Sequence, residues 1–177
     1  MEFLKIYGVI QDPGTKEYII IMQYANNGSL WSYLDQNINM LTWRMKLEFL
    51  KNIACNLKVI HCNGSMHCNL HGGNIVVHDH SPFVCDLRFS RSTNSRGSNP
   101  TIRGVLPFTA PEVFHDRKFT QKSDIYSFGI IICLVATGEP PFRDRQFNRG
   151  LICDMMDGLR PSMPDSVLLV LPSRFHQ

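Results

Sequence analysis

Two short segments of this chain hold side chains that could do chemistry. Residues 66–75 (MHCNLHGGNI) contain Asn69, His71 and Asn74, and Asp86 follows directly after an apolar run. Because a carboxylate and an amide carbonyl are hard oxygen ligands, Asp86 and Asn74 could hold a divalent cation, or else form hydrogen bonds within a loop. Asn69 is a neutral amide that can orient a hydroxyl group but accepts its proton poorly. His71, as a lone histidine, is open to a role in catalysis or in hydrogen bonding within the loop.

Two His-Cys pairs in the same region offer a different chemistry. His61-Cys62 and His67-Cys68 together provide four possible zinc ligands within a short stretch. They lack the C-x₂₋₄-C and H-x₃₋₅-H order that is usual in zinc sites. We therefore expect no zinc site here.

The first element expected to support these residues is a β-hairpin. Residues 4–10 and 17–22 are β-rich runs, and the turn-type residues 11–15 between them contain Pro and Gly. A second turn-type stretch, residues 26–29, then ends the strand pattern. Its last residue, Ser29, is placed to cap a short helix. The pattern predicts a strand pair followed by a helix.

A long amphipathic helix should follow, from Thr42 to about Gly64. Its apolar positions recur at steps of three and four, which predicts one core-facing stripe. That stripe consists of Leu47, Leu50, Ala54, Leu57 and His61. Short β-branched runs at residues 76–77 and 83–84 then predict two small strands joined by a turn.

The second half of the chain contains a loop and a buried helix. Residues 88–103 are rich in Ser, Asn, Arg and Gly and poor in large apolar residues, so we expect a mobile loop. Ser123 is placed to cap a helix over residues 124–137, which is apolar on all sides and should be buried until Gly138 stops it. Helices and strands together predict an α+β domain.

Composition favours one globular domain that resides in the cytoplasm. The chain has 177 residues, of which 44% are hydrophobic, and its net charge of +3 is not concentrated in a basic run. We therefore expect neither a nucleic-acid nor a membrane partner. The longest apolar run, residues 130–136, is too short to span a bilayer, and residues 1–3 lack the basic start of a signal peptide. The six cysteines form no C-x-x-C pair, which favours reduced thiols.

The order of four motifs resembles the protein kinase domain, and specifically its tyrosine-kinase-like group. Residues 67–74 (HCNLHGGN) align with the catalytic loop H-R-D-L-x-x-x-N, with Cys for Arg and Asn for Asp. Residues 86–88 (DLR) stand where D-F-G belongs, residues 110–112 match A-P-E, and residues 124–129 (DIYSFG) match the buried helix whose Asp supports the loop. The resemblance covers roughly residues 3–165.

The resemblance implies a fold and a domain division. It predicts a protein-kinase-like α+β fold, mainly the helical large lobe with a partial small-lobe sheet and a hinge. Residues 1–166 would form this partial domain and residues 167–177 a divergent tail. It also implies ATP and Mg²⁺ as cofactors and a protein substrate or partner.

By the same resemblance, individual residues receive roles. Asn69 takes the position of the catalytic base, His71 lies near the transferred phosphate, and Asn74 and Asp86 match the metal-binding residues. Residues 22–30 resemble the hinge, and the residues expected to contact the nucleotide, besides Asp86, are Met22 at the gatekeeper, the backbone of Gln23 and Ala25, and Val76.

Several departures from the family pattern predict impaired catalysis. The glycine-rich loop, the Lys strand and its Glu helix would all have to precede Phe3, so phosphate binding should be crippled. Loss of a positioned base costs about 10²–10⁴ in rate. Cys68 removes the guanidinium that would receive an activation-loop phosphate. The phosphate acceptors concerned are Ser92, Thr93, Ser95, Ser98 and Thr101. Glu112 is expected to lack the Arg that pairs with it.

Three hypotheses follow from the sequence. The first is a catalytically impaired kinase-like chain, a pseudokinase, that acts as a binding or scaffolding element in signalling. The second is an active Ser/Thr or Tyr kinase seen as an incomplete gene model. The third is a gene fragment without a functional product.

Overall fold

The computed structural model describes residues 3–94 and 104–163 of the chain. The helices are α1 (Leu30–Asn37), α2 (Trp43–Cys62), α3 (Pro111–Asp116), α4 (Gln121–Thr137) and α5 (Arg149–Met156). The strands are β1 (Ile6–Gln11), β2 (Tyr18–Met22), β3 (Ser65–Met66), β4 (Ile75–His78), β5 (Ser81–Val84) and β6 (Arg91–Ser92). The strands pair as three two-stranded antiparallel sheets: β1 with β2, β3 with β6, and β4 with β5. This mixture of helices and strands confirms the predicted α+β class.

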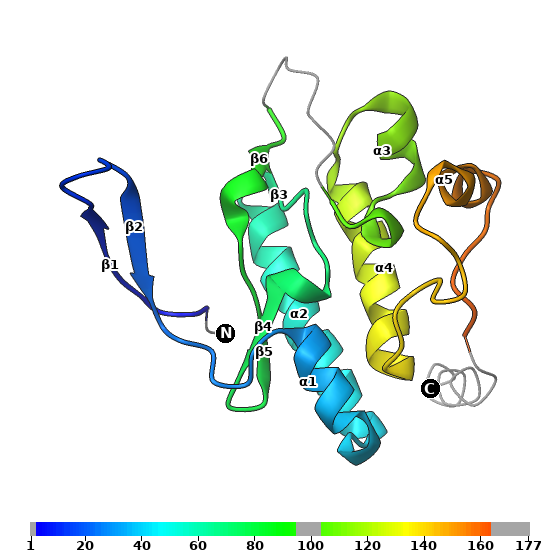
Figure 1. Cartoon of the computed structure of the whole chain (residues 1–177), viewed down its shortest axis with the longest axis horizontal. Coiled ribbons are helices and arrows are strands. Elements are labelled where there is room, and N and C mark those ends of the chain that lie inside the picture. The colour runs from blue at the N-terminus through cyan, green and yellow to red at the C-terminus, as the bar shows by residue number, and fades with distance from the viewer. Residues whose placement is uncertain (1–2, 95–103, 164–177) are drawn as a thin grey trace.

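The predicted hairpin is present as β1 and β2, and Figure 1 shows it standing apart from the helical body. Its turn is closed by Asp12, whose carboxylate accepts hydrogen bonds from the backbone N–H groups of Gly14 and Thr15. Every residue of β2 is exposed. Besides Tyr18, the strand consists of three isoleucines and Met22, all with large apolar side chains. The hairpin therefore carries apolar surface that no other described element covers.

The core lies among α1, α2, α4 and the β4–β5 pair. Its largest fully buried side chains come from all of these elements and include Leu34, Ile53, Ile75, Ile131 and Leu134. Ser29 caps α1 as predicted, since its hydroxyl accepts a hydrogen bond from the Ser32 N–H. Strands β4 and β5 confirm the two predicted small strands. This body holds the segment of residues 66–75 on one side of α4 (Figure 1).

The core-facing stripe predicted for α2 is confirmed at Leu57, which is buried, and in part at Leu50, which packs against the core, but Leu47 is exposed. The buried residues of α2 are Phe49, Ile53, Asn56, Leu57 and Ile60. The helix has two apolar stripes, and packing against β5 and α1 decides which one is buried. Asn56 belongs to the buried stripe because its Oδ1 accepts a hydrogen bond from the Val84 N–H at 3.0 Å. The other stripe contributes Ala54 and Leu57 to an open apolar groove of about 360 Å³, opposite Ile125 and Phe128 of α4.

The cap predicted for the buried helix is also wrong. Helix α4 begins one turn earlier, and its N-cap is Thr120, whose hydroxyl accepts from the Ser123 N–H. Ser123 instead returns a bond, because its Oγ accepts from the Thr120 N–H, which completes a capping box. Nor is the helix buried on all sides, since Ile125 is 49% exposed. Gly138 ends the helix with a φ of +76°, as predicted.

The described part of the predicted loop, residues 88–94, contains a short strand. Strand β6 lies within it and pairs with β3, so that Ser65 faces Ser92 and Met66 faces Arg91. Residues 95–103, which include the possible phosphate acceptors Ser95, Ser98 and Thr101, fall outside the described residues. The predicted tail at 167–177 does so as well. Glu112 is exposed and makes no ion pair in the described part of the chain.

Candidate functional site

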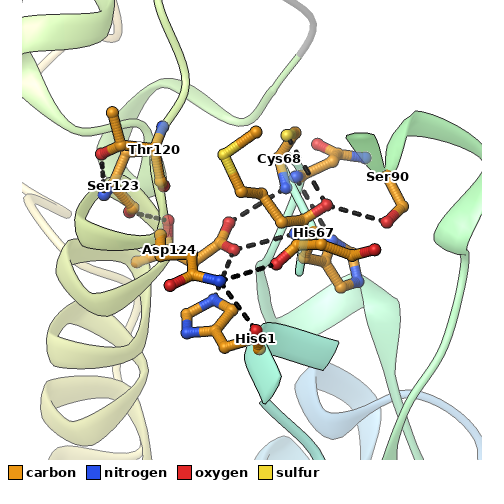
Figure 2. Close-up of polar contacts among 12 residues, drawn as sticks. His61, His67, Cys68, Ser90, Thr120, Ser123 and Asp124 are labelled. Carbon is orange, nitrogen blue, oxygen red and sulfur yellow. Dashed lines mark hydrogen bonds and ion pairs between the residues drawn. The ribbon is translucent and has the colours of Figure 1, made fainter. Parts of the chain in front are cut away.

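Asp124 organises the candidate site from the first turn of α4. Its carboxylate is 2% exposed and accepts three hydrogen bonds, which Figure 2 shows converging from α2 and from the loop after β3. Oδ2 accepts from the His67 N–H at 2.8 Å and contacts His61 Nε2 at 2.8 Å, and Oδ1 accepts from the Cys68 N–H at 3.0 Å. A buried carboxylate with three donors is well satisfied. It therefore ties the loop to the buried helix.

Cys68 has an unusual backbone conformation at this point. Its φ is +64°, in the left-handed region that non-glycine residues avoid at a cost of about 1–2 kcal/mol. The Asp124 carboxylate holds its N–H, and its thiol is buried. Burial, followed by the nearby Asp124 charge, raises the pKa of the Cys68 thiol to about 12. Cys68 is thus a protonated packing residue, and no cationic side chain is present at this position.

His67 is fully buried beneath the loop. Its Nδ1 accepts from the Asn69 N–H at 3.3 Å, so Nε2 is the protonated nitrogen that donates to the Cys85 carbonyl at 3.0 Å. Burial lowers the pKa of His67 below that of an exposed histidine, although the bond to Cys85 opposes this shift. His67 is therefore a neutral structural residue that links the loop to the segment leading to Asp86.

The side chain of Asn74 reaches the backbone of Asn69 across the loop. Asn74 Nδ2 donates to the backbone carbonyl of Asn69 at 2.9 Å, which closes the loop on itself. A cavity of about 10 Å³, room for roughly one water molecule, separates Asn69 and His71 from the segment near Thr109. Segment packing is tight there, since a Cβ atom added at Gly104 would lie 2.7 Å from Thr109 Oγ1 and 3.7 Å from Asn69 Oδ1.

His71 borders the same cavity and has a local structural task. Its Nδ1 accepts from the Gly73 N–H at 3.0 Å, which caps the short 3-10 turn Gly72–Asn74. Burial lowers the pKa of His71, and the neighbouring His67 lowers it further, while Asp86 acts in the opposite direction. The neutral ring therefore exposes an Nε2–H donor, and not a second base, toward its surroundings.

Asp86 lies beyond β5, where the chain turns sharply. It has a φ of +62° and is followed by the 3-10 turn Leu87–Phe89. This turn brings Arg88 back to Asp86, so that Arg88 Nε lies 2.9 Å from Oδ1 and 3.1 Å from Oδ2. The Asp86 side chain is 20% exposed and that of Arg88 is 73% exposed. The carboxylate that the sequence assigns to metal binding is thus in an ion pair with its own neighbour.

Protein kinase chemistry depends on Mg²⁺, which the sequence assigns to Asn74 and Asp86. As the side chains lie, the two residues do not fit a divalent ion, because Asp86 holds a guanidinium at both oxygens. Asn74 uses its amide N–H for Asn69 and its backbone carbonyl for the Cys85 N–H, which leaves its side-chain Oδ1 without a partner among the described residues, so the misfit lies at Asp86. Metal binding at this pair remains a prediction of the sequence.

The predicted hinge connects the hairpin to the body. Met22 ends β2, and the Gln23 N–H donates to the Lys5 carbonyl at 2.7 Å. The next stretch is tied to β4, since the Val77 N–H donates to the Gly28 carbonyl at 2.8 Å and the Asn27 N–H to the Val77 carbonyl at 3.0 Å.

The hinge leaves backbone groups for a ligand. Within residues 3–94 and 104–163, the Gln23 carbonyl and the Ala25 N–H have no hydrogen-bond partner. Val76 lies between Ile75 and Val77, which are fully buried, and its half-buried side chain therefore points to the opposite face of β4. These free groups can hydrogen-bond a planar ligand edge, and their roles toward adenine remain predictions.

Two important residues were not recognised in the sequence as site residues. His61 was placed in the apolar stripe of α2, yet it contacts the Asp124 carboxylate. Gln121 donates from Nε2 to the carbonyls of His61 at 2.9 Å and Ser65 at 3.3 Å. The sequence did indicate His61, because it is a polar residue in the last turn of an otherwise apolar stripe. Nothing in the sequence indicated the role of Gln121.

The described residues contain neither a metal-binding cluster nor a membrane-spanning helix. No group of three or more His, Cys, Asp or Glu side chains there is arranged to hold a metal ion, and the His61 ring contacts Asp124 while the His67 ring donates to the Cys85 carbonyl. None of the helices in the same residues is long and apolar enough to cross a bilayer.

Comparison with known proteins identifies the family. Residues 1–163 match the protein kinase domain. The chain is 30% identical over 159 residues to the probable serine/threonine-protein kinase roco5 of Dictyostelium discoideum, which covers 83% of this chain and 6% of that protein. It is also 30% identical over 149 residues to the RGS domain-containing serine/threonine-protein kinase A of the same organism, covering 84% of this chain and 13% of that protein.

A mammalian relative gives the same result. Human mitogen-activated protein kinase kinase kinase 13 is 28% identical over 128 residues, covering 72% of this chain and 13% of that protein. The chain therefore spans only about 6–13% of the length of these relatives. The match of residues 1–163, with loop, D-x-x, A-P-E and buried-helix motifs in order, shows that the chain belongs to the protein kinase domain family.

Proposed function

We propose that this chain is a catalytically impaired protein kinase domain that acts as a binding or scaffolding element in cytoplasmic signalling. Members of the family use ATP and Mg²⁺ and act on or bind proteins. The observation that carries the proposal is Asn69, a neutral amide at the base position of a loop whose backbone is otherwise held in place. An amide can orient a substrate hydroxyl but cannot take up its proton effectively.

Two further observations support impairment. The Asp86 carboxylate is paired with Arg88, and residues near Gly104 and Thr109 leave a cavity of only about 10 Å³ beside Asn69. Phosphoryl transfer needs an acceptor hydroxyl within hydrogen-bond reach of the base, and a cavity with room for about one water molecule leaves little space for a substrate side chain. All six cysteines are free thiols, in keeping with a reducing compartment.

The framework that supports a binding role is retained. Asp124, His67 and the capped helix α4 keep the large-lobe body in one piece, and the hinge presents the free carbonyl of Gln23 and the free N–H of Ala25. A domain can bind a nucleotide or protein with such a framework without transferring phosphate. We therefore propose that the chain binds a protein partner, and that this binding depends weakly or not at all on ATP and Mg²⁺.

A phosphotransfer assay on the purified chain tests the proposal. Radiolabelled ATP, Mg²⁺ and a generic protein substrate are supplied to the wild type, Asn69→Asp and Asp86→Ala, with the exposed Asn94→Asp as the matched control. We expect no wild-type turnover above that of Asp86→Ala in the purified chain, and, in the full protein, a gain with Asn69→Asp but not with Asn94→Asp. Sustained phosphotransfer by the wild type that is abolished in Asp86→Ala would refute the proposal.

The binding role needs a separate measurement in cells that express the full protein. We expect Asp86→Ala to leave its signalling output unchanged, because no phosphate is transferred. Asp124→Ala, which removes the support of the loop, is expected to abolish that output. An output lost with both variants would instead indicate a catalytic role.

A further inference from the structure

In the Asp86–Arg88 pair, a single guanidinium nitrogen contacts both oxygens of the carboxylate. One nitrogen, Arg88 Nε, lies within 3.1 Å of both carboxylate oxygens, at 2.9 Å from Oδ1 and 3.1 Å from Oδ2. A cation shared between the two oxygens of one carboxylate occupies the position that a chelated metal ion would take. In residues 3–94 and 104–163, Asp86 makes no other ion pair.

The local backbone holds Arg88 in this position. Asp86 is in the left-handed region, and the following 3-10 turn is closed by a hydrogen bond from the Ser90 N–H to the Leu87 carbonyl at 2.9 Å. The Arg88 guanidinium also lies over the ring of Phe89, 5.0 Å from its centroid. Because the turn and the ring both restrict the side chain, the ion pair loses less conformational entropy than a free surface pair.

The guanidinium keeps donors for other groups. Only Nε is used for Asp86, and the terminal N–H groups of Arg88 have no partner among the described residues. The 73% exposure of the side chain places these donors toward solvent. In this pair the Asp86 charge is neutralised by Arg88 Nε, while the terminal N–H groups of the guanidinium face solvent.

We propose that Arg88 takes the place of a divalent cation at Asp86. The guanidinium supplies the positive charge beside the carboxylate, and Mg²⁺ or Mn²⁺ binds there only when Arg88 is displaced. This inference goes beyond the proposed function, because metal binding decides it and phosphotransfer does not. An arginine at residue 88 is the feature that distinguishes the site from a D-F-G sequence, in which glycine provides no competing charge.

Manganese binding to the intact chain tests the inference, with free Mn²⁺ measured by electron paramagnetic resonance. The proteins are the wild type, Arg88→Gln, Arg88→Gln with Asp86→Asn, and Arg91→Gln. Arg88→Gln removes the charge and keeps a side chain compatible with the 3-10 turn. Arg91 lies three residues away in β6 and makes no ion pair with Asp86, so Arg91→Gln is the matched control.

We expect Arg88→Gln to bind Mn²⁺ about two- to fivefold more tightly than the wild type, the change that loss of one competing exposed ion pair brings. The gain should vanish when Asp86→Asn is added, and Arg91→Gln should bind as the wild type does. Thermal unfolding provides a second readout, because a given concentration of Mn²⁺ should raise the Tm of Arg88→Gln more than that of the wild type.

Two results would overturn the inference. One is an Arg88→Gln variant that binds Mn²⁺ no better than the wild type. The other is a gain in Arg88→Gln that persists when Asp86→Asn is added, since the metal would then not bind at Asp86. Neither result depends on phosphotransfer activity, so failure here and failure of the proposed function are distinguishable.

Discussion

The Asp124 carboxylate accepts a hydrogen bond from the backbone N–H of Cys68, a residue whose φ is +64°. One buried acid on α4 thus holds a loop residue in a conformation that it would otherwise leave. The same acid also serves His67 and His61, so the loop and two helices share one anchor. The stability of the candidate site depends on this anchor more than on any side chain assigned to catalysis.

Asp124→Ala is expected to lower the free energy of unfolding by about 3–5 kcal/mol. The substitution leaves two buried N–H donors, those of His67 and Cys68, without an acceptor. Urea denaturation followed by circular dichroism measures the change. Asp116→Ala, at a carboxylate that is 58% exposed, is the control and should change stability by less than about 0.5 kcal/mol. Equal effects of the two variants would contradict the anchor role.

Two tyrosines are expected to respond in opposite ways to loss of the hydroxyl group. The Tyr126 hydroxyl is buried without a hydrogen-bond partner among the described residues, so Tyr126→Phe should be neutral or stabilising. The Tyr33 hydroxyl lies 2.8 Å from His80 Nδ1, so Tyr33→Phe should cost about 1 kcal/mol. Thermal unfolding of both variants gives the comparison. A larger loss for Tyr126→Phe would show that its hydroxyl has a partner.

Stability should fall in mild acid because of two histidines. Burial lowers the pKa of His67 and of His71, so the unfolded chain takes up protons near pH 6.5 that the folded chain takes up only at lower pH. Their contribution is fully present above about pH 6.5 and is lost as pH falls below it, by up to about 1.4 kcal/mol per pH unit for each histidine. Urea denaturation between pH 7 and pH 5.5 measures this slope.

His71→Gln isolates one of the two contributions. It should reduce the slope by about half, because only His67 then remains. Its effect on the slope separates titration from packing, since a packing defect shifts stability equally at every pH. A variant with the wild-type slope would contradict the lowered pKa of His71.

The cysteines should differ in their reactivity toward iodoacetamide. Burial raises the pKa of Cys68 to about 12 and that of Cys85 to about 11, which leaves thiolate fractions of about 10⁻⁴ and 10⁻³ at pH 8. Cys62 and Cys153 are exposed and should be modified first. Peptide mass spectrometry after timed labelling measures the order. Labelling of Cys68 at the rate of Cys153 in the folded chain would contradict its burial.

Two glycines of the same region should give opposite results on replacement by alanine. Gly138 has a φ of +76°, and a Cβ there would lie 2.5 Å from Ile38 Cγ1, so Gly138→Ala should cost about 2 kcal/mol or more. Gly129 lies inside α4 with open space where a Cβ would be, so Gly129→Ala should stabilise by about 0.5–1 kcal/mol. Denaturant melts of the pair provide the measurement. Destabilisation by both would show that α4 tolerates no added methyl group.

Local signals predicted several elements well. The Ser29 cap, the hairpin and the stop at Gly138 depend on residues close together in the sequence, and all three are present. The buried stripe of α2 could not be predicted, because α2 has two apolar stripes and only packing against β5 distinguishes them. Thr120 was missed as a cap because Ser123, three residues later, carries the same kind of hydroxyl and takes part in the same capping box.

The candidate site was predictable in identity but not in its contacts. Motif spacing located Asn69, Asn74 and Asp86, since the spacing is a property of the sequence. The Asp86–Arg88 ion pair depends on the 3-10 turn between β5 and β6, and the His61–Asp124 contact joins residues 63 positions apart. Side-chain pairing of this kind requires the folded backbone.

The isolated position of the β1–β2 hairpin has a consequence for the hinge. A two-stranded ribbon without a covered apolar face is marginally stable, so its amide hydrogens should exchange with solvent through local opening. The amide hydrogens of α4 should exchange only through global unfolding. Gln23 and Ala25 join this labile ribbon to the firmly held loop before α1. A ligand that uses their free groups must therefore order the ribbon as it binds, and its affinity is reduced by that entropy.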